Sequence, residues 1–224
     1  MTTQATRATK TAPRHPDIQD APATEKLPPL AERASTSPRS RIRRHPERSM
    51  PEVAEEVLRI GLVAHVAFVV EGQPYIVPMT YHYDDGVVYL HGAPASRLQK
   101  TLRAGARVAI EVLLADGLVA SRDAKNHSMN YRSVIVYGTA EPVTDTKHKR
   151  ALMEAMTERY FPGRTVGRDY DPATTGHLRA MDLMAVAIEE LSAKARSGPP
   201  RGSRDALDDA PGSAFVVTLP GLDR

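Results

Sequence analysis

The 224-residue chain contains no cysteine, so disulfide bonds, thiolate metal sites and cysteine nucleophiles are excluded. No apolar run approaches the roughly 18–20 residues that a membrane-spanning helix needs. No apolar signal-peptide core follows the N-terminus either. These absences predict a cytoplasmic protein without a membrane association.

The sequence also lacks the short motifs that mark many enzyme classes. It has no Walker loop, no dinucleotide fingerprint G-x-G-x-x-G, no nucleophile elbow G-x-S-x-G and no H-E-x-x-H zinc motif. The eight histidines show no metal-ligand spacing, so no metal site is predicted. If the protein is an enzyme, we expect an organic cofactor to supply the chemistry.

Composition divides the chain into three parts. Residues 1–48 are rich in Thr, Ala, Pro, Arg and Ser and predict a disordered basic tail, because they bury too little apolar surface to offset their ordering entropy. Its arginines suit a solubilising tail or an arm that contacts nucleic acid, and the lack of interleaved aromatic residues favours the tail. Residues 49–197 form the predicted folded domain. Residues 198–224 are a Pro- and Gly-rich tail, in which residues 214–219 can dock as a strand.

The folded domain predicts about seven strands and three helices. Most strands are joined by tight turns, such as Asp84–Gly86 and Asp116–Gly117, and hairpin connections imply antiparallel pairing. The pattern therefore favours a mainly β antiparallel barrel with peripheral helices. Gly138, inside a long predicted strand, indicates a bulge or a close backbone approach. The predicted strands cover residues 62–70, 75–83, 87–91, 107–114, 118–121, 131–143 and 183–191, and the helices cover residues 49–60, 96–104 and 144–160.

The stretch from Pro74 to Arg97 carries the strongest functional pattern. Ser96 and Arg97 open a short helix after a Gly-Ala-Pro break, and a hydroxyl followed by Arg at a helix start suits an anion. Ser96 could equally be only a helix cap, and Arg97 a solvated side chain. His91, at the end of the preceding strand, could contact a ligand, donate a proton, ligate a haem iron or serve only as a structural hydrogen bonder.

Two further places could contribute to a site. Tyr131, Arg132 and Ser133 open a long strand after a segment that is dense in hydrogen-bond donors. Lys194 and Arg196 are two residues apart near the end of the last core strand, so they share a face and could present paired positive charge. An exposed edge and a pair of solvated charges are the alternative interpretations.

Three blocks, in this order, resemble the flavin-nucleotide-binding split-barrel proteins of the pyridoxamine 5′-phosphate oxidase-like superfamily, in the branch that includes the nitroimidazole-resistance proteins. The blocks read HVAFVVEGQPYIVPMTYHYDDGVVYLHGAPASR, HSMNYRSVIVYGTAEPV and IEELSAKARSGPP, and the resemblance covers residues 65–200. It implies a six-stranded antiparallel split barrel, a homodimer, and FMN bound between the subunits.

The resemblance also implies roles for individual residues. One strand would run along the flavin ring, the helix start would hold the phosphate, the long strand would contribute from the partner subunit, and His91 would be the polar group on the substrate side. The implied flavin contacts are Val77, Pro78, Met79, Thr80, His91, Ser96, Arg97, Tyr131, Arg132, Ser133, Lys194 and Arg196.

The chain departs from the pyridoxamine phosphate oxidases proper. Leu98 stands where they carry Lys after the Ser-Arg pair, and residues 77–81 contain neither Arg nor Lys, so one or two phosphate contacts are lost. Their C-terminal substrate motif, which contains Arg and His, is also not recognisable. The resemblance therefore implies an FMN-dependent oxidoreductase with another substrate, taking electrons from a reduced nicotinamide to a small acceptor such as a nitro compound or a quinone. The alternatives are a haem-binding split barrel, with His91 or His127 on the iron, and a non-catalytic flavin-binding regulator whose basic arm contacts DNA.

Overall fold

The computed structural model describes residues 28–219, and its strands form one antiparallel sheet that closes into a split barrel. The strand order is β2-β1-β5-β6-β7-β4-β3, with β8 also paired to β6 and β9 to β5. The predicted class, mainly β with peripheral helices, is confirmed, although the described part holds nine strands rather than six. The strands are β1 Ala64–Val70, β2 Gln73–Met79, β3 His82–Asp84, β4 Val87–Gly92, β5 Arg107–Ala120, β6 Ser128–Pro142, β7 Asp182–Ala187, β8 Glu190–Arg196 and β9 Phe215–Thr218.

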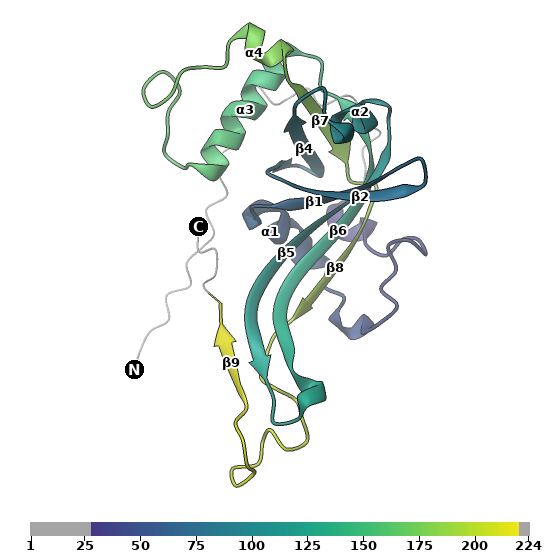
Figure 1. Cartoon of the computed structure of the whole chain (residues 1–224), viewed down its shortest axis with the longest axis vertical. Coiled ribbons are helices and arrows are strands. Elements are labelled where there is room, and N and C mark those ends of the chain that lie inside the picture. Colours follow the sequence, from purple (N-terminus) through teal and green to yellow (C-terminus); the bar gives the residue numbers. More distant parts are fainter. Residues whose placement is uncertain (1–27, 220–224) are drawn as a thin grey trace.

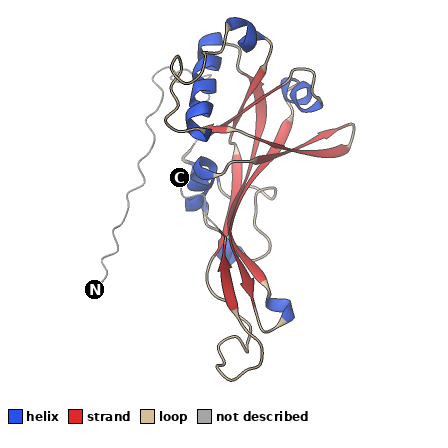
Figure 2. Cartoon of the chain, turned by 60° about the vertical axis from the view of Figure 1, so that its left-hand side comes forward, coloured by secondary structure: helices blue, strands red, loops and turns tan. Residues whose placement is uncertain are grey.

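Short helices surround this sheet. The α-helices are α1 Ala54–Ile60, α2 Arg97–Arg103, α3 Thr146–Tyr160 and α4 Thr175–Arg179, and the 3₁₀ turns are η1 Leu30–Arg33, η2 Pro46–Arg48, η3 Pro51–Val53 and η4 Ala124–Asn126. Figure 2 shows that α3 and α4 gather at one end of the molecule. None of the helices in the described residues is long and apolar enough to cross a membrane.

Two apolar clusters hold the fold together. The larger fills the barrel with side chains from α1, α2 and most of the strands. The smaller lies between α3 and the outer face of β4 and β7, where Leu152 and Met156 of the helix pack against Tyr89 and Leu183. Alternation along β4 explains the division, because Val88 and Leu90 face the barrel while Tyr89 faces α3.

The long hairpin of β5 and β6 extends beyond the barrel as an arm, with η4 near its tip and β9 along its edge (Figure 1). The prediction of a turn at Asp116–Gly117 was wrong, because β5 runs unbroken from Arg107 to Ala120 and the ladder only shifts register between Ala115 and Gly117. Asp and Gly here form a bulge instead of a turn.

Two other predicted strands are each divided in the structure. The run 75–83 splits into β2, which pairs with β1, and β3, which pairs with β4. The run 183–191 splits into β7 and β8 at Ile188, which is fully buried, so the apolar pattern continues through the break. The turn at Asp84–Gly86 is confirmed, with positive φ at Asp85 (43°) and Gly86 (84°).

The segment before α1 is attached to the barrel. The backbone N–H of Ser35 donates to the Leu191 carbonyl at 2.9 Å, and that of Met50 donates to the Ala193 carbonyl at 3.0 Å. Arg33, only 8% exposed, donates to the Ile188 carbonyl at 2.7 Å. The structure thus differs from the predicted tail over residues 28–48, which lie along β8, while residues 1–27 of that prediction lie outside the described residues.

Candidate functional site

A cavity of about 510 Å³ lies between β2, the end of β4 and the start of α2. It brings together two segments that sequence analysis singled out, the strand residues 77–80 and the stretch from His91 to Arg97. The described residues that line it are Phe68, Tyr75, Val77, Pro78, Met79, Thr80, His91, Gly92, Ala93, Ser96, Arg97, Leu98 and Gln99.

The strand β2 forms one wall of the cavity. Among the described strands it pairs with β1 alone, so one edge carries backbone groups without a neighbouring strand. Proline cannot donate to a ladder, and Pro74 and Pro78 are accordingly found on this edge strand. Tyr75 stacks on Phe68 of β1, with ring centroids 5.5 Å apart, and together they give the wall an aromatic patch.

Ser96 and Arg97, which sequence analysis assigned to phosphate binding, have a defined local structure at the start of α2. Ser96 caps the helix, because its Oγ accepts the backbone N–H of Gln99 at 3.2 Å. The guanidinium carbon of Arg97 lies 4.3 Å from the centre of the Tyr75 ring, a cation–π contact across the cavity wall. Because α2 has only seven residues, the charge of Arg97 matters more for an anion here than a helix dipole does.

Arg97 is the one Lys or Arg among the described lining residues. No carboxylate within residues 28–219 pairs with it, in contrast to Arg103 on the same helix, which lies 2.7 Å from Asp182. The cavity therefore joins an apolar and aromatic wall to a single uncompensated positive charge.

His91 lies at the edge of the cavity and is partly buried. Its Nδ1 has no hydrogen-bond partner among the described residues. Burial lowers the pKa of His91, so at neutral pH the ring is uncharged and can donate or accept one hydrogen bond.

Gln99 is a lining residue that sequence analysis missed. It is 1% exposed, and neither its amide oxygen nor its amide nitrogen has a hydrogen-bond partner within the described residues. The only local signal was its position three residues after the cap, which places it on the inward side of the helix with Leu98 and Leu102.

The remaining predicted contacts do not line this cavity. The guanidinium group of Arg132 donates two hydrogen bonds to the Asp116 carboxylate, at 2.7 and 3.1 Å, and one to Glu56 at 2.7 Å. Arg132 therefore connects the arm to α1. Lys194 donates to the Arg44 carbonyl at 3.0 Å, and Arg196 binds the Asn130 side chain. By strand register, Tyr131, Ser133, Lys194 and Arg196 share one face of the sheet.

Comparison with known proteins links this geometry to a family. Residues 51–195 match the model of the family described as pyridoxamine 5′-phosphate oxidase. No curated protein matches the sequence.

Several solved structures resemble this one. A protein described as the FAD and heme binding protein from Mycobacterium smegmatis is 31% identical, with a TM-score of 0.69 over 76% of this chain and 82% of its own. The flavocytochrome Anf3 from Azotobacter vinelandii is 28% identical, with a TM-score of 0.71 over 82% of this chain and 85% of its own. A 5-nitroimidazole antibiotic resistance protein homologue from Bacteroides thetaiotaomicron shares the fold, at 22% identity and a TM-score of 0.53 over 64% of this chain and 82% of its own.

Proposed function

The chain belongs to the pyridoxamine 5′-phosphate oxidase family, and we propose that it is a flavin-dependent oxidoreductase that binds the FMN group in the cavity beside α2. The observation that carries the proposal is the composition of that cavity. An apolar and aromatic wall suits a flat ring, and the uncompensated Arg97 at one end suits a phosphate. The two structures described above at 31% and 28% identity have names that include a flavin.

The residues around the cavity fit such a cofactor. Val77 and Met79 offer apolar side chains, and the free edge of β2 offers backbone groups to a ring that lies along it. Arg97 would bind phosphate oxygens, and the Ser96 hydroxyl, whose oxygen already caps α2, can still donate its proton. The neutral His91 would hydrogen-bond a substrate at the ring.

The chemistry that a bound flavin supplies is two-electron transfer from a reduced nicotinamide donor to a small organic acceptor, of the nitro or quinone type. Pyridoxamine phosphate is not proposed as the substrate, because the C-terminal substrate motif of the pyridoxamine phosphate oxidases, which contains Arg and His, is not recognisable in this chain. FMN and the FMN half of FAD would make the same contacts here, so identification of the released chromophore separates them.

A homodimer is part of the proposal. Strand register places Val69, Ile76 and Leu113 on one face of the sheet, where they are 59%, 64% and 42% exposed. Ser133, opposite Leu113, and Lys194, opposite Ser133, belong to the same face. A second copy covering this face would bury these apolar side chains and bring its own Ser133 and Lys194 toward the interface.

The first test compares Arg97→Ala with Lys100→Ala, an exposed cation on the same helix. Charge-assisted hydrogen bonds predict that Arg97→Ala weakens FMN binding by about 10–100-fold, while Lys100→Ala has little effect. Titration of the apoprotein, followed by flavin fluorescence, measures both. Unchanged FMN affinity in Arg97→Ala would remove Arg97 from the site, and a wild-type protein that takes up no flavin would refute the proposed function.

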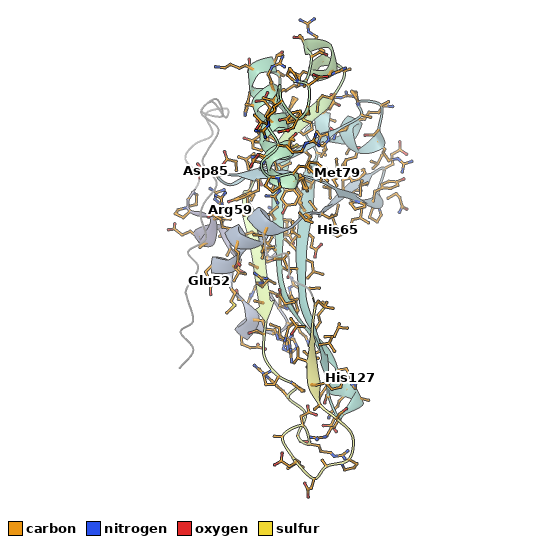
Figure 3. All side chains as sticks on the ribbon, turned by 90° about the vertical axis from the view of Figure 1, so that its left-hand side faces the viewer. Glu52, Arg59, His65, Met79, Asp85 and His127 are labelled. Carbon is orange, nitrogen blue, oxygen red and sulfur yellow. The ribbon has the colours of Figure 1, made fainter. Side chains whose placement is uncertain are left out.

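Haem binding is a second candidate, favoured by the presence of His91 among the lining residues of the cavity and by the haem named for the Mycobacterium smegmatis protein. His127 is not part of this candidate site, because it lies near the tip of the arm, far from Met79 (Figure 3). A Soret band in the purified protein that His91→Ala abolishes would support haem. A flavin spectrum without a Soret band would exclude it.

A further inference from the structure

The amide of Gln99 is buried without any hydrogen bond. The residue is 1% exposed, and both its Oε1 and its Nε2 lack partners within residues 28–219. Buried amides are nearly always hydrogen-bonded in folded proteins, because an unpaired one keeps the full cost of leaving water. Gln99 therefore destabilises the empty protein, and an apolar side chain of the same length would serve the packing of α2 better.

The neighbours of Gln99 place this amide beside the cavity. A Cβ built on Gly92 would lie 2.7 Å from Nε2 and 3.1 Å from Cγ of Gln99, so a larger residue at position 92 would force the Gln99 side chain to move. Gly92 does not have a positive φ, and the space it provides is thus its contribution. Gly92, Ser96, Arg97 and Gln99 all line the same cavity.

We infer that Gln99 recognises the ribityl chain of the flavin, through an amide that stays unpaired beside Gly92 in the empty protein and turns into the cavity when the cofactor binds. This inference rests on the proposed flavin site. Gln99 sits one helical turn after Ser96, and its backbone N–H already contacts the Ser96 hydroxyl, so it lies next to the expected phosphate position and on the way to the ring along β2.

The chemistry of the two groups matches. Each ribityl hydroxyl can both donate and accept a hydrogen bond, and the Gln99 amide has one free acceptor and one free donor group. A phosphate at the neighbouring Arg97 only accepts, so it could satisfy the Nε2 but not the Oε1. The flat ring against Val77 and Met79 would contact apolar side chains instead.

The test uses Gln99→Met, which keeps the length of the side chain and removes both polar atoms. We expect two changes of opposite sign. The melting temperature of the apoprotein rises by about 2–8 °C, because the unpaired amide is gone. The affinity for flavin falls by about 5–50-fold, because two hydrogen bonds to the ribityl chain are lost.

Binding measurements with three flavins show which part of the cofactor Gln99 contacts. Riboflavin has the ribityl chain without the phosphate, and lumiflavin has neither. Gln99→Met should weaken FMN and riboflavin by the same factor and leave lumiflavin unchanged. Arg97→Ala, the matched control, should weaken FMN and leave riboflavin nearly unchanged.

Two results would overturn the inference. Equal flavin affinities of Gln99→Met and wild type, or an equal loss for lumiflavin and FMN, would show that the amide does not recognise the ribityl chain. A lower melting temperature of the apo variant would show that Gln99 is structural. If the wild type binds FMN and the variant behaves in one of these ways, only this inference fails; if the wild type binds no flavin, the proposed function fails with it.

Discussion

Replacing Gly138 with alanine should destabilise the barrel at the point where β6 meets β7. A Cβ built at position 138 would overlap the backbone carbonyl oxygen of Ala187 and lie 2.9 Å from Cγ1 of Val186. The carbonyl belongs to the backbone at the end of β7 and cannot rotate away, so the two strands must separate or β6 must bend. Overpacking of this kind costs about 1–3 kcal/mol, and contact with backbone places Gly138→Ala at the upper end.

Gly176→Ala is the matched control. It makes the same chemical change in α4, where the nearest atom to the added Cβ is Oγ1 of Thr174, at an ordinary contact distance of 3.7 Å. Alanine is preferred to glycine in a helix, so this variant should gain about 0.5–1 kcal/mol.

Thermal unfolding separates the two cases. For a chain of this size, about 1 kcal/mol corresponds to roughly 2–4 °C in melting temperature. We expect Gly138→Ala to melt about 6–12 °C below the wild type and Gly176→Ala to melt slightly above it. A Gly138→Ala protein that melts within about 2 °C of the wild type would refute the steric reasoning.

Two further predictions concern partly buried polar groups. Burial, with smaller contributions from Arg159 and Arg59, lowers the pKa of His82 from 6.5 to about 4, so the unfolded chain binds the proton more readily. Stability is then fully present above pH 6.5 and falls as the pH drops toward 4. Between pH 7.5 and pH 5, protonation of His82 in the unfolded chain should lower the unfolding free energy by about 2 kcal/mol. His82→Phe should abolish this part of the decrease, and an unchanged pH dependence of the unfolding free energy would contradict the prediction. Tyr160 accepts the Tyr81 N–H at 2.9 Å, so Tyr160→Phe should lower the unfolding free energy in urea by about 1–3 kcal/mol, and a change below about 0.5 kcal/mol would argue against that role.

Features that depend on local backbone chemistry could be predicted from the sequence. The Asp84–Gly86 turn needs positive φ, which its residues tolerate, and Ser96 has the composition of a helix cap. Gly138 was predicted to mark a close approach of the backbone, and the structure identifies the neighbouring strand as β7. In these cases the residue type and its immediate neighbours are enough.

Features that depend on residues far away in the sequence could not be predicted. Asp116–Gly117 has the same local pattern as a turn, but the pairing of β5 with β6 continues past it and turns it into a bulge. The sequence does not reveal the break between β7 and β8 at Ile188, because Ile188 is apolar and buried like the strand residues around it. The position of Gln99 three residues after the cap indicated only an inward-facing side chain, because the room for its amide depends on where the fold puts Gly92.

The cavity of one chain supplies little positive charge for a bound phosphate. Within the described lining of the cavity, a dianionic phosphate would meet Arg97 alone. Burial and the nearby Arg48 and Arg201 together lower the pKa of Arg196, so like charges are crowded on this part of the sheet, at a cost that a bound anion would relieve. Arg196 and Lys194 share the face that carries the exposed apolar side chains of β1, β2 and β5. Under the homodimer proposed above, covering that face would bring the crowded charges of one subunit to the interface with its partner, where a bound anion would offset them.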